Sequence, residues 1–176
     1  QYCMPYPNQV LSAAAYPAVT NARATGDYFH ADHQWAVGAT SLFYWAIGIL
    51  PFKDGFYSST HPQIGGQTVG PETDPDREAL MATLSGAMVG PMDGIYLLNK
   101  TRVMTTCMGD GTVLKPDVPV HTSDSCFMNV MESQADPGTC WVYHTWSDLE
   151  GVGRIHYHFS NGAGTPMTPA MVHLDD

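Results

Sequence analysis

Carboxylates are the side chains of this sequence best suited to acid–base chemistry. Asp27 follows Arg23 by four residues, Asp54 stands at the tip of the stretch 52–57, and Asp93 follows the small-residue stretch 85–91. A positioned carboxyl group can donate or accept a proton during a reaction. It can equally close a turn, as Asp27 could after a glycine, or serve as a structural acid where a strand ends. The three positions are therefore candidate site residues, each with a structural alternative.

Histidines form two short clusters that could hold a metal ion. His30 and His33 flank Asp32, and His156 and His158 are two residues apart on one predicted strand. A zinc or other transition-metal site normally takes three or four protein ligands, and neither cluster has a third ligand at a diagnostic spacing. We therefore expect packed or solvated histidines, with no metal and no other cofactor.

Charge and hydropathy exclude two classes of partner. The 176 residues carry 17 acidic against 7 basic side chains, for a formal net charge of -10. Such an acidic chain is poorly suited to nucleic acid or to an anionic membrane. The longest apolar candidate, 36–52, is interrupted by Gly38, Gly48 and Pro51, and so falls short of the roughly 18 apolar residues that a membrane span needs. We expect no nucleic acid and no membrane among the partners.

Four cysteines point to an oxidising compartment. Cys3, Cys107, Cys126 and Cys140 contain no CxxC pair and no metal-like spacing. This pattern favours two disulfides, with three possible connectivities, over a zinc site. Asn99-Lys100-Thr101 is in addition an N-glycosylation sequon. The sequence therefore predicts a secreted protein that is glycosylated at Asn99.

Along the sequence, the predicted elements that position these side chains are αβ units, followed by antiparallel strands near the end. Helices are predicted from the apolar run 35–49, from the Pro75 start of 76–84, and from 95–107. The stretch 58–76 reads as a long loop, and 85–91 as a small-residue strand and turn. Alternating aromatic and β-branched residues predict strands at 141–146 and 154–159, with turns at 150–151 and 161–162. This order suggests a parallel α/β region followed by the opening of a β-sandwich.

Several short motifs occur in the order found in one enzyme family. Five segments resemble the later barrel strands of α-galactosidases and raffinose synthases. They are 1–5, 23–28 (Arg-Ala-Thr-Gly-Asp-Tyr), 51–58 (Pro-Phe-Lys-Asp-Gly-Phe-Tyr-Ser), 84–94 (ending Asp93-Gly94) and 109–116 (Gly-Asp-Gly-Thr-Val-Leu-Lys-Pro). Each motif alone is weakly specific. The ordered set, which covers residues 1 to about 120, is moderately specific.

The resemblance implies both a fold and a set of roles. The fold would be α/β: residues 1–120 would form the C-terminal part of a (β/α)8 barrel, strands 6–8, and residues 121–176 the beginning of an antiparallel β-sandwich. Asp27 would be the catalytic acid/base, and Arg23 would orient it or contact the sugar. Asp54 and Asp93 would bind sugar hydroxyls, and Trp35 would stack on a sugar ring.

A two-carboxylate mechanism also needs a nucleophile about 5 Å from the acid/base. In this family the nucleophile belongs to a Lys-x-Asp motif on the fourth strand, which would precede residue 1. A complete barrel takes about 250 residues, so we expect the remainder of the same protein or other chains to complete it. The carbohydrate partner would be an α-linked galactoside or related sugar. The alternative is a non-catalytic secreted structural, storage or carbohydrate-binding protein that keeps the fold.

Two positions depart from the pattern of the raffinose synthases. Gly26 replaces an Asp before Asp27, and Lys53 replaces a Trp before Asp54. These changes predict an altered sugar pocket and a substrate other than raffinose.

Overall fold

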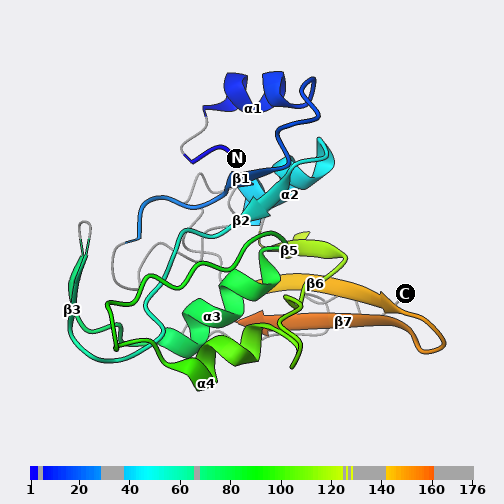
Figure 1. Ribbon diagram of the computed structural model, residues 1–176. Helices are drawn as coiled ribbons and strands as arrows, with labels where there is room; N and C mark the ends of the chain where they lie inside the picture. The colour runs from blue at the N-terminus through cyan, green and yellow to red at the C-terminus, as the bar shows by residue number, and fades with distance from the viewer. Residues whose placement is uncertain are drawn as a thin grey trace.

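The computed structural model describes residues 1–3, 6–28, 38–65, 68–124, 126, 128 and 142–160. These residues form a mixed α/β structure, in which a parallel pair of strands lies beside helices and a three-stranded antiparallel sheet extends away from them (Figure 1). None of the helices in the described ranges has the length and apolarity that crossing a membrane would need. The predicted α/β class is confirmed at this level, whereas a closed barrel is not seen among the described residues.

The first unit places two short strands in parallel. β1 (Asn21–Arg23) pairs with β2 (Leu50–Phe52), and Tyr2 adds a parallel bridge to Ala22 on the other side of β1. α1 (Pro7–Ala13) precedes β1, and α2 (Gly38–Ala46) connects β1 to β2. The helix predicted over 35–49 is therefore confirmed from residue 38, and its first three residues lie outside the described ranges.

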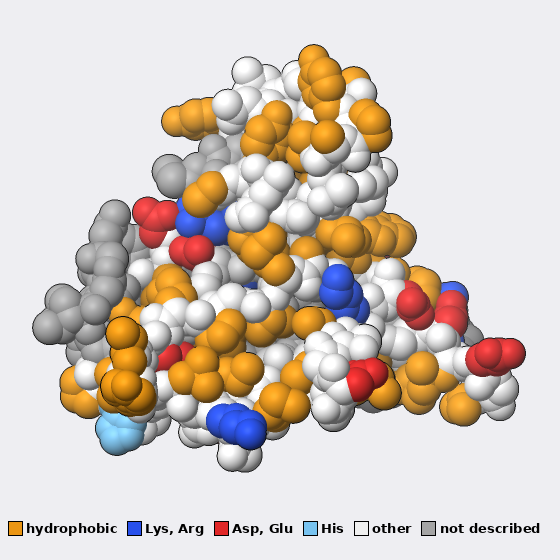
Figure 2. Space-filling view, viewed as in Figure 1, with side chains coloured by type: hydrophobic (Ala, Val, Ile, Leu, Met, Phe, Trp, Pro, Cys, Tyr) orange, Lys and Arg blue, Asp and Glu red, His pale blue; other side chains and the backbone are white. Residues whose placement is uncertain are grey.

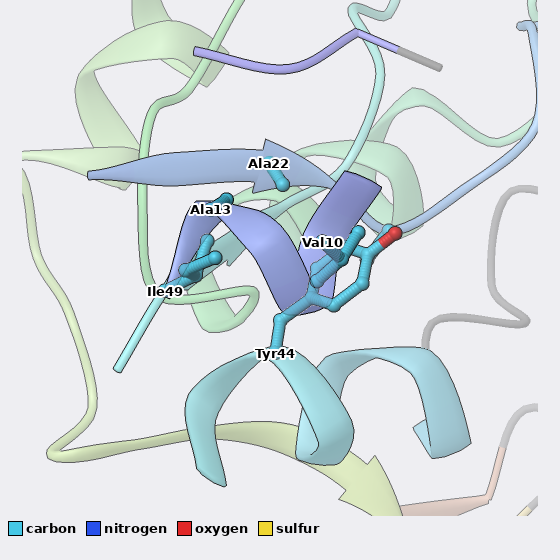
Figure 3. Packing of buried hydrophobic residues seen from close by; sticks show 6 residues of the cluster. Val10, Ala13, Ala22, Tyr44 and Ile49 are labelled. Carbon is cyan, nitrogen blue, oxygen red and sulfur yellow. The ribbon is translucent and has the colours of Figure 1, made fainter. Parts of the chain in front are cut away.

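A small apolar core holds this unit together. Val10 and Ala13 of α1 meet Ala22 of β1, Tyr44 of α2 and Ile49, and all five are buried (Figure 3). The Tyr44 ring points from α2 toward Val10, so α1 and α2 are joined through side chains that also contact the strand (Figure 3). Burial of apolar area of this kind contributes about 25 cal/mol per Å2, which fixes β1 and hence the residues that follow it.

α3 (Pro75–Leu84) confirms the second predicted helix. Proline stands at its first position, and the Asp74 carboxylate accepts the backbone N–H of Arg77 at 3.3 Å. These are the expected signals of a helix start.

The predicted helix over 95–107 is much shorter than expected. α4 covers Lys100–Val103 and a 3-10 turn, η1, covers Met104–Thr106. Residues 95–97 form a turn in which Tyr96 has a φ of 67°, a left-handed conformation that a continuous helix cannot contain. Asn99 caps the helix that follows, because its side chain accepts the Arg102 N–H.

Two further expectations were wrong in their detail. The predicted loop 58–76 contains a short antiparallel hairpin, β3 (Gln63–Gly65) with β4 (Thr68–Gly70), whose strands are too short for an alternating pattern to reveal. The predicted strand at 85–91 is not a strand; only Pro91 makes a parallel bridge, to Phe56.

The C-terminal described part is an antiparallel sheet in the order β5-β6-β7. Its strands are β5 (Val118–Thr122), β6 (Val142–Leu149) and β7 (Gly153–Ser160), with the predicted turn at residues 150–151 between the last two. Tyr143 and Phe159 stack on one face of the sheet, and Tyr143 joins a core cluster with Val120 and with Met81 of α3. The predicted strands are confirmed, and β5 crosses the boundary expected at residue 120.

Candidate functional site

The carboxyl ends of the parallel segments meet at one place. Cys3 follows the Tyr2 bridge, Arg23 ends β1, and Asp54 lies two residues beyond β2. The backbone N–H of Ala24 donates to the carbonyl of Phe52 at 2.8 Å, which keeps the two strand ends in register. In parallel α/β sheets, ligands bind outside these carboxyl ends. The predicted residues Arg23, Asp27 and Asp54 are thus brought together on the edge where a ligand is expected.

Arg23 is the centre of this cluster. Its side chain is only 6% exposed, and two of its guanidinium nitrogens reach different acids. Nη2 lies 2.7 Å from Asp27 Oδ1, and Nη1 lies 3.1 Å from Asp54 Oδ2. A planar guanidinium suits this double contact because its nitrogens form a fixed fork. The two carboxylates, at 38% and 25% exposure, therefore lie close together and open to solvent above a buried cation.

The electrostatics of Arg23 follow from this arrangement. Burial acts to lower the pKa of the guanidinium, and it is outweighed by the hydrogen bond to Asp27 and the charges of Asp54, Cys3 and Asp27. The pKa of Arg23 is therefore raised above its usual value. Arg23 remains a permanent positive charge that fixes both acids.

The loop after β1 is also tied to the loop after β2. Asp54 Oδ2 accepts the backbone N–H of Tyr28 at 2.9 Å, and the Asp54 N–H donates to Thr25 Oγ1 at 3.0 Å. These bonds close the segment 25–28 over the end of β2. The position of Asp27 is consequently set by contacts on both sides of it.

A cavity of about 380 Å3 opens beside this cluster. It is lined by Arg23 and Asp27, by the loop 24–26, by Cys3, and by three further side chains, Tyr6, Thr40 and Tyr44. Tyr6 is exposed at 73% and Tyr44 is buried, so the lining has one solvent-exposed and one buried aromatic residue. Such a volume with a few polar groups is typical of a small-molecule site.

Lys53, where the resemblance predicts an altered sugar pocket, does not line this cavity. Its side chain is fully buried, and Nζ lies 2.5 Å from Glu78 Oε2 of α3. Nζ also donates to the carbonyls of Asp54, at 3.1 Å, and of Gly55, at 3.3 Å. Burial lowers the pKa of Lys53, and the Glu78 charge opposes that change. Lys53 therefore supports the backbone of Asp54 from beneath. Gly26, the other position that departs from the raffinose-synthase pattern, does line the cavity.

A second buried acid lies in the same region. The Tyr28 hydroxyl donates a short hydrogen bond to Glu72, and both residues are buried. Burial, followed by the hydrogen bond to Glu72, raises the pKa of Tyr28 well above its usual value. Tyr28 accordingly stays protonated and acts as a donor, which anchors the residue next to Asp27.

Asp93 and Asn99 make structural contacts outside the cavity lining. The Asp93 carboxylate accepts the backbone N–H of Ser58 at 2.9 Å and of Ser59 at 3.2 Å. Asn99 accepts the Arg102 N–H through Oδ1 at 3.1 Å and is partly exposed. Asp93 thus fixes the backbone of residues 58–59, its sugar-binding role stays a prediction, and so does glycosylation of Asn99.

The described residues show the predicted framework of two disulfides at most in part. Cys3 and Cys107 are free thiols, so four cysteines cannot make two bridges. Cys126 is buried and disulfide-bonded. Cys140 and the predicted stacking residue Trp35 lie outside the described residues.

A Lys-x-Asp triplet like that of the family's nucleophile segment does occur, at 115–117. It lies directly before β5, and the Asp117 carboxylate accepts the backbone N–H of Asp148 at 2.6 Å. This acid belongs to the antiparallel sheet and not to the cavity lining. It is therefore poorly placed to act with Asp27.

The cavity contains residues that sequence reasoning missed. Tyr6 and Tyr44 come from α1 and α2, on opposite sides of β1 in the sequence. Tyr6 precedes Pro7, and this helix-start signal could have located α1 and its first aromatic residue. Only the packing of α1 against α2 places both rings on one cavity, and no local pattern encodes that.

Comparison of the chain with protein-family models, with curated proteins and with solved structures finds no match.

Proposed function

We propose that this chain contributes the acid/base half of an α-galactosidase-type glycoside hydrolase site. The observation that carries the proposal is the Arg23 cluster: one buried guanidinium holds Asp27 and Asp54 at the carboxyl ends of neighbouring parallel strands, beside an open cavity. The order of the motifs that resemble this family supports the same reading. Asp27 is the residue that protonates the leaving glycosidic oxygen.

Asp27 would have two tasks in a retaining reaction: it gives a proton to the leaving oxygen and later takes one from water. The hydrogen bond from Arg23 Nη2, at 2.7 Å, holds the Asp27 carboxylate beside the cavity in which both steps would occur.

The other lining groups fit a sugar. The exposed Tyr6 ring offers an apolar face of the kind that stacks on a pyranose, and the Thr40 hydroxyl can bond a sugar hydroxyl. The substrate class is an α-linked galactoside. The nucleophile comes from another strand, supplied by the remainder of the protein or by another chain.

The proposed architecture rests on the parallel segments. Tyr2, β1 and β2 lie side by side in parallel, and a further parallel bridge joins Phe56 to Pro91. These contacts are of the kind that the last strands of a (β/α)8 barrel make, and β5–β7 would begin the following β-sandwich. Secretion and glycosylation at Asn99 belong to the same proposal.

One observation favours a second candidate function, a carbohydrate-binding protein without hydrolytic activity. Among the described residues, Asp27 is the one acid that lines the cavity, and Asp54 is turned toward Arg23. A single carboxylate is sufficient for binding a sugar but not for the two-step retaining reaction. The two candidates share the site and differ in chemistry.

An assay of hydrolysis distinguishes the glycoside hydrolase from the carbohydrate-binding protein. The protein, with any polypeptide that co-purifies with it, is assayed on a nitrophenyl α-galactoside alongside Asp27→Asn and Asp76→Asn. Asp76 is a matched control because it also pairs with an arginine, Arg102, but lies on α3 away from the cavity lining. We expect Asp27→Asn to lose at least about 100-fold in rate, the usual contribution of an acid/base group, and Asp76→Asn to keep full activity. Equal loss in both variants, or hydrolysis that survives Asp27→Asn, would overturn the catalytic assignment.

A further inference from the structure

Three histidines gather on one face of the antiparallel sheet. In the register of β6 and β7, His144 stands opposite His158, and Trp146 stands opposite His156. Because side chains alternate along a strand, positions 144, 156 and 158 point to the same side. This is the face opposite to the one on which Tyr143 and Phe159 stack.

The three side chains are close enough to share an ion. One ring nitrogen from each of them lies within 4.8 Å of the others. His144 Nε2 is 2.9 Å from His156 Nδ1, and the His144 and His158 ring centroids are 4.4 Å apart. A tetrahedral zinc site with three imidazoles needs bonds of about 2.0–2.1 Å to each nitrogen. The partly exposed rings would therefore have to rotate from their stacked arrangement to bring the three nitrogens around one centre.

A fourth imidazole lies next to these three. His121 of β5 stands opposite His144 on its other side, with ring centroids 5.2 Å apart. Its Nδ1 lies 3.0 Å from the carbonyl of Pro119. Histidine ligands commonly donate one ring nitrogen to a backbone carbonyl and so present the other to the metal. His121 is thus in contact with one member of the group, His144.

We propose that His144, His156 and His158 bind one divalent transition-metal ion of the zinc class, with water or His121 in the fourth position. The ligand set consists of imidazole nitrogens with no thiolate, which suits Zn2+, Ni2+ or Cu2+ and disfavours Ca2+ and Mg2+. The site joins β6 to β7 far along the chain from the Asp27 cavity. It does not depend on the proposed glycosidase function.

Binding of Zn2+ or Co2+ alone tests the proposed metal site. The protein is stripped with a chelator and titrated with Zn2+ by calorimetry, and with Co2+ by visible absorption. We expect saturable binding of one ion per chain and a melting temperature that rises with Zn2+. The visible bands of bound Co2+ would report nitrogen ligands directly.

Variants locate the site. His156→Ala removes an exposed ligand and should leave the metal-free fold intact by circular dichroism, while its Zn2+ affinity falls at least about tenfold. His158→Ala should act alike, and His61→Ala, an exposed histidine outside the cluster, should bind as the unchanged protein does. The proposal is overturned if Zn2+ does not bind stoichiometrically, if His156→Ala binds unchanged, or if His61→Ala weakens binding as strongly.

Discussion

At the scale of single residues, two buried cations support the carboxyl ends of β1 and β2. Arg23 lies beneath Asp27 and Asp54, and Lys53 lies deeper, against Glu78 and the backbone carbonyls that follow β2. Arg23 serves the candidate site directly, since its acids are partly exposed. Lys53 serves it indirectly, since it holds the backbone on which Asp54 stands. The position of Asp54 at the end of β2 therefore depends on the buried Lys53–Glu78 ion pair, which a ligand in the cavity would not touch.

The buried pair gives a stability prediction. Lys53→Met leaves Glu78 without its cation in a site where both side chains are fully buried, and we expect the free energy of unfolding to fall by about 3–5 kcal/mol. Urea denaturation measures the change. The double variant Lys53→Met with Glu78→Leu replaces both charges by apolar groups and should recover much of the loss. A single variant that costs less than about 1 kcal/mol would show that the two groups are not a buried ion pair.

At the scale of elements, the start of α3 and the β6–β7 hairpin were the most predictable features. Pro75 with nearby acids identified α3, and the alternation in 141–146 and 154–159 identified two strands. The predicted turn did not fix the register of this hairpin. A two-residue turn at 150–151 would pair residue 149 with 152 and hence 144 with 157, whereas the observed loop has three residues and pairs 149 with 153 and 144 with 158. Sequence reasoning therefore weighed His156 and His158 on one strand and could not place His144 beside them.

Other elements could not be predicted, for physical reasons. The strands β3 and β4 have three residues each, too few for any periodicity. The helix expected from 95 begins late because Tyr96 adopts a left-handed conformation and Asn99 caps the helix after it. Disulfide pairing is a matter of three-dimensional distance, and spacing in the sequence could not reveal that Cys3 and Cys107 are free.

The cap of α3 gives a prediction at the same scale. Asp74→Ala removes the carboxylate that accepts the Arg77 N–H, and loss of an N-cap usually costs about 1 kcal/mol. The adjacent exposed residue provides the control, since Thr73→Ala alters the same loop without touching the cap. Thermal and urea unfolding should separate the two variants. Equal stabilities would mean that the Asp74 side chain does not stabilise the helix.

At the scale of the whole molecule, candidate chemistry is divided between the two sheets. The parallel pair carries the Arg23 cluster and its cavity, and the antiparallel sheet carries the histidines. α3 contacts both parts, since Glu78 pairs with Lys53 next to β2 and Met81 packs against Val120 of β5. The surface adds apolar side chains over α1, where Leu11 and the flanking Tyr6 and Tyr16 are exposed (Figure 2). The cavity thus opens beside a partly apolar surface, as a sugar-stacking site would.

Binding of a sugar to the cavity tests the central claim most directly. Methyl α-galactoside is titrated into the protein, into Asp27→Asn and into Asp76→Asn by calorimetry. We predict saturable binding that weakens at least about tenfold in Asp27→Asn, since a hydrogen bond to a charged group contributes about 1.5–3 kcal/mol, and that is unchanged in Asp76→Asn. Absence of binding to the unchanged protein, or equal affinity in Asp27→Asn, would contradict the assignment of this cavity as a carbohydrate site.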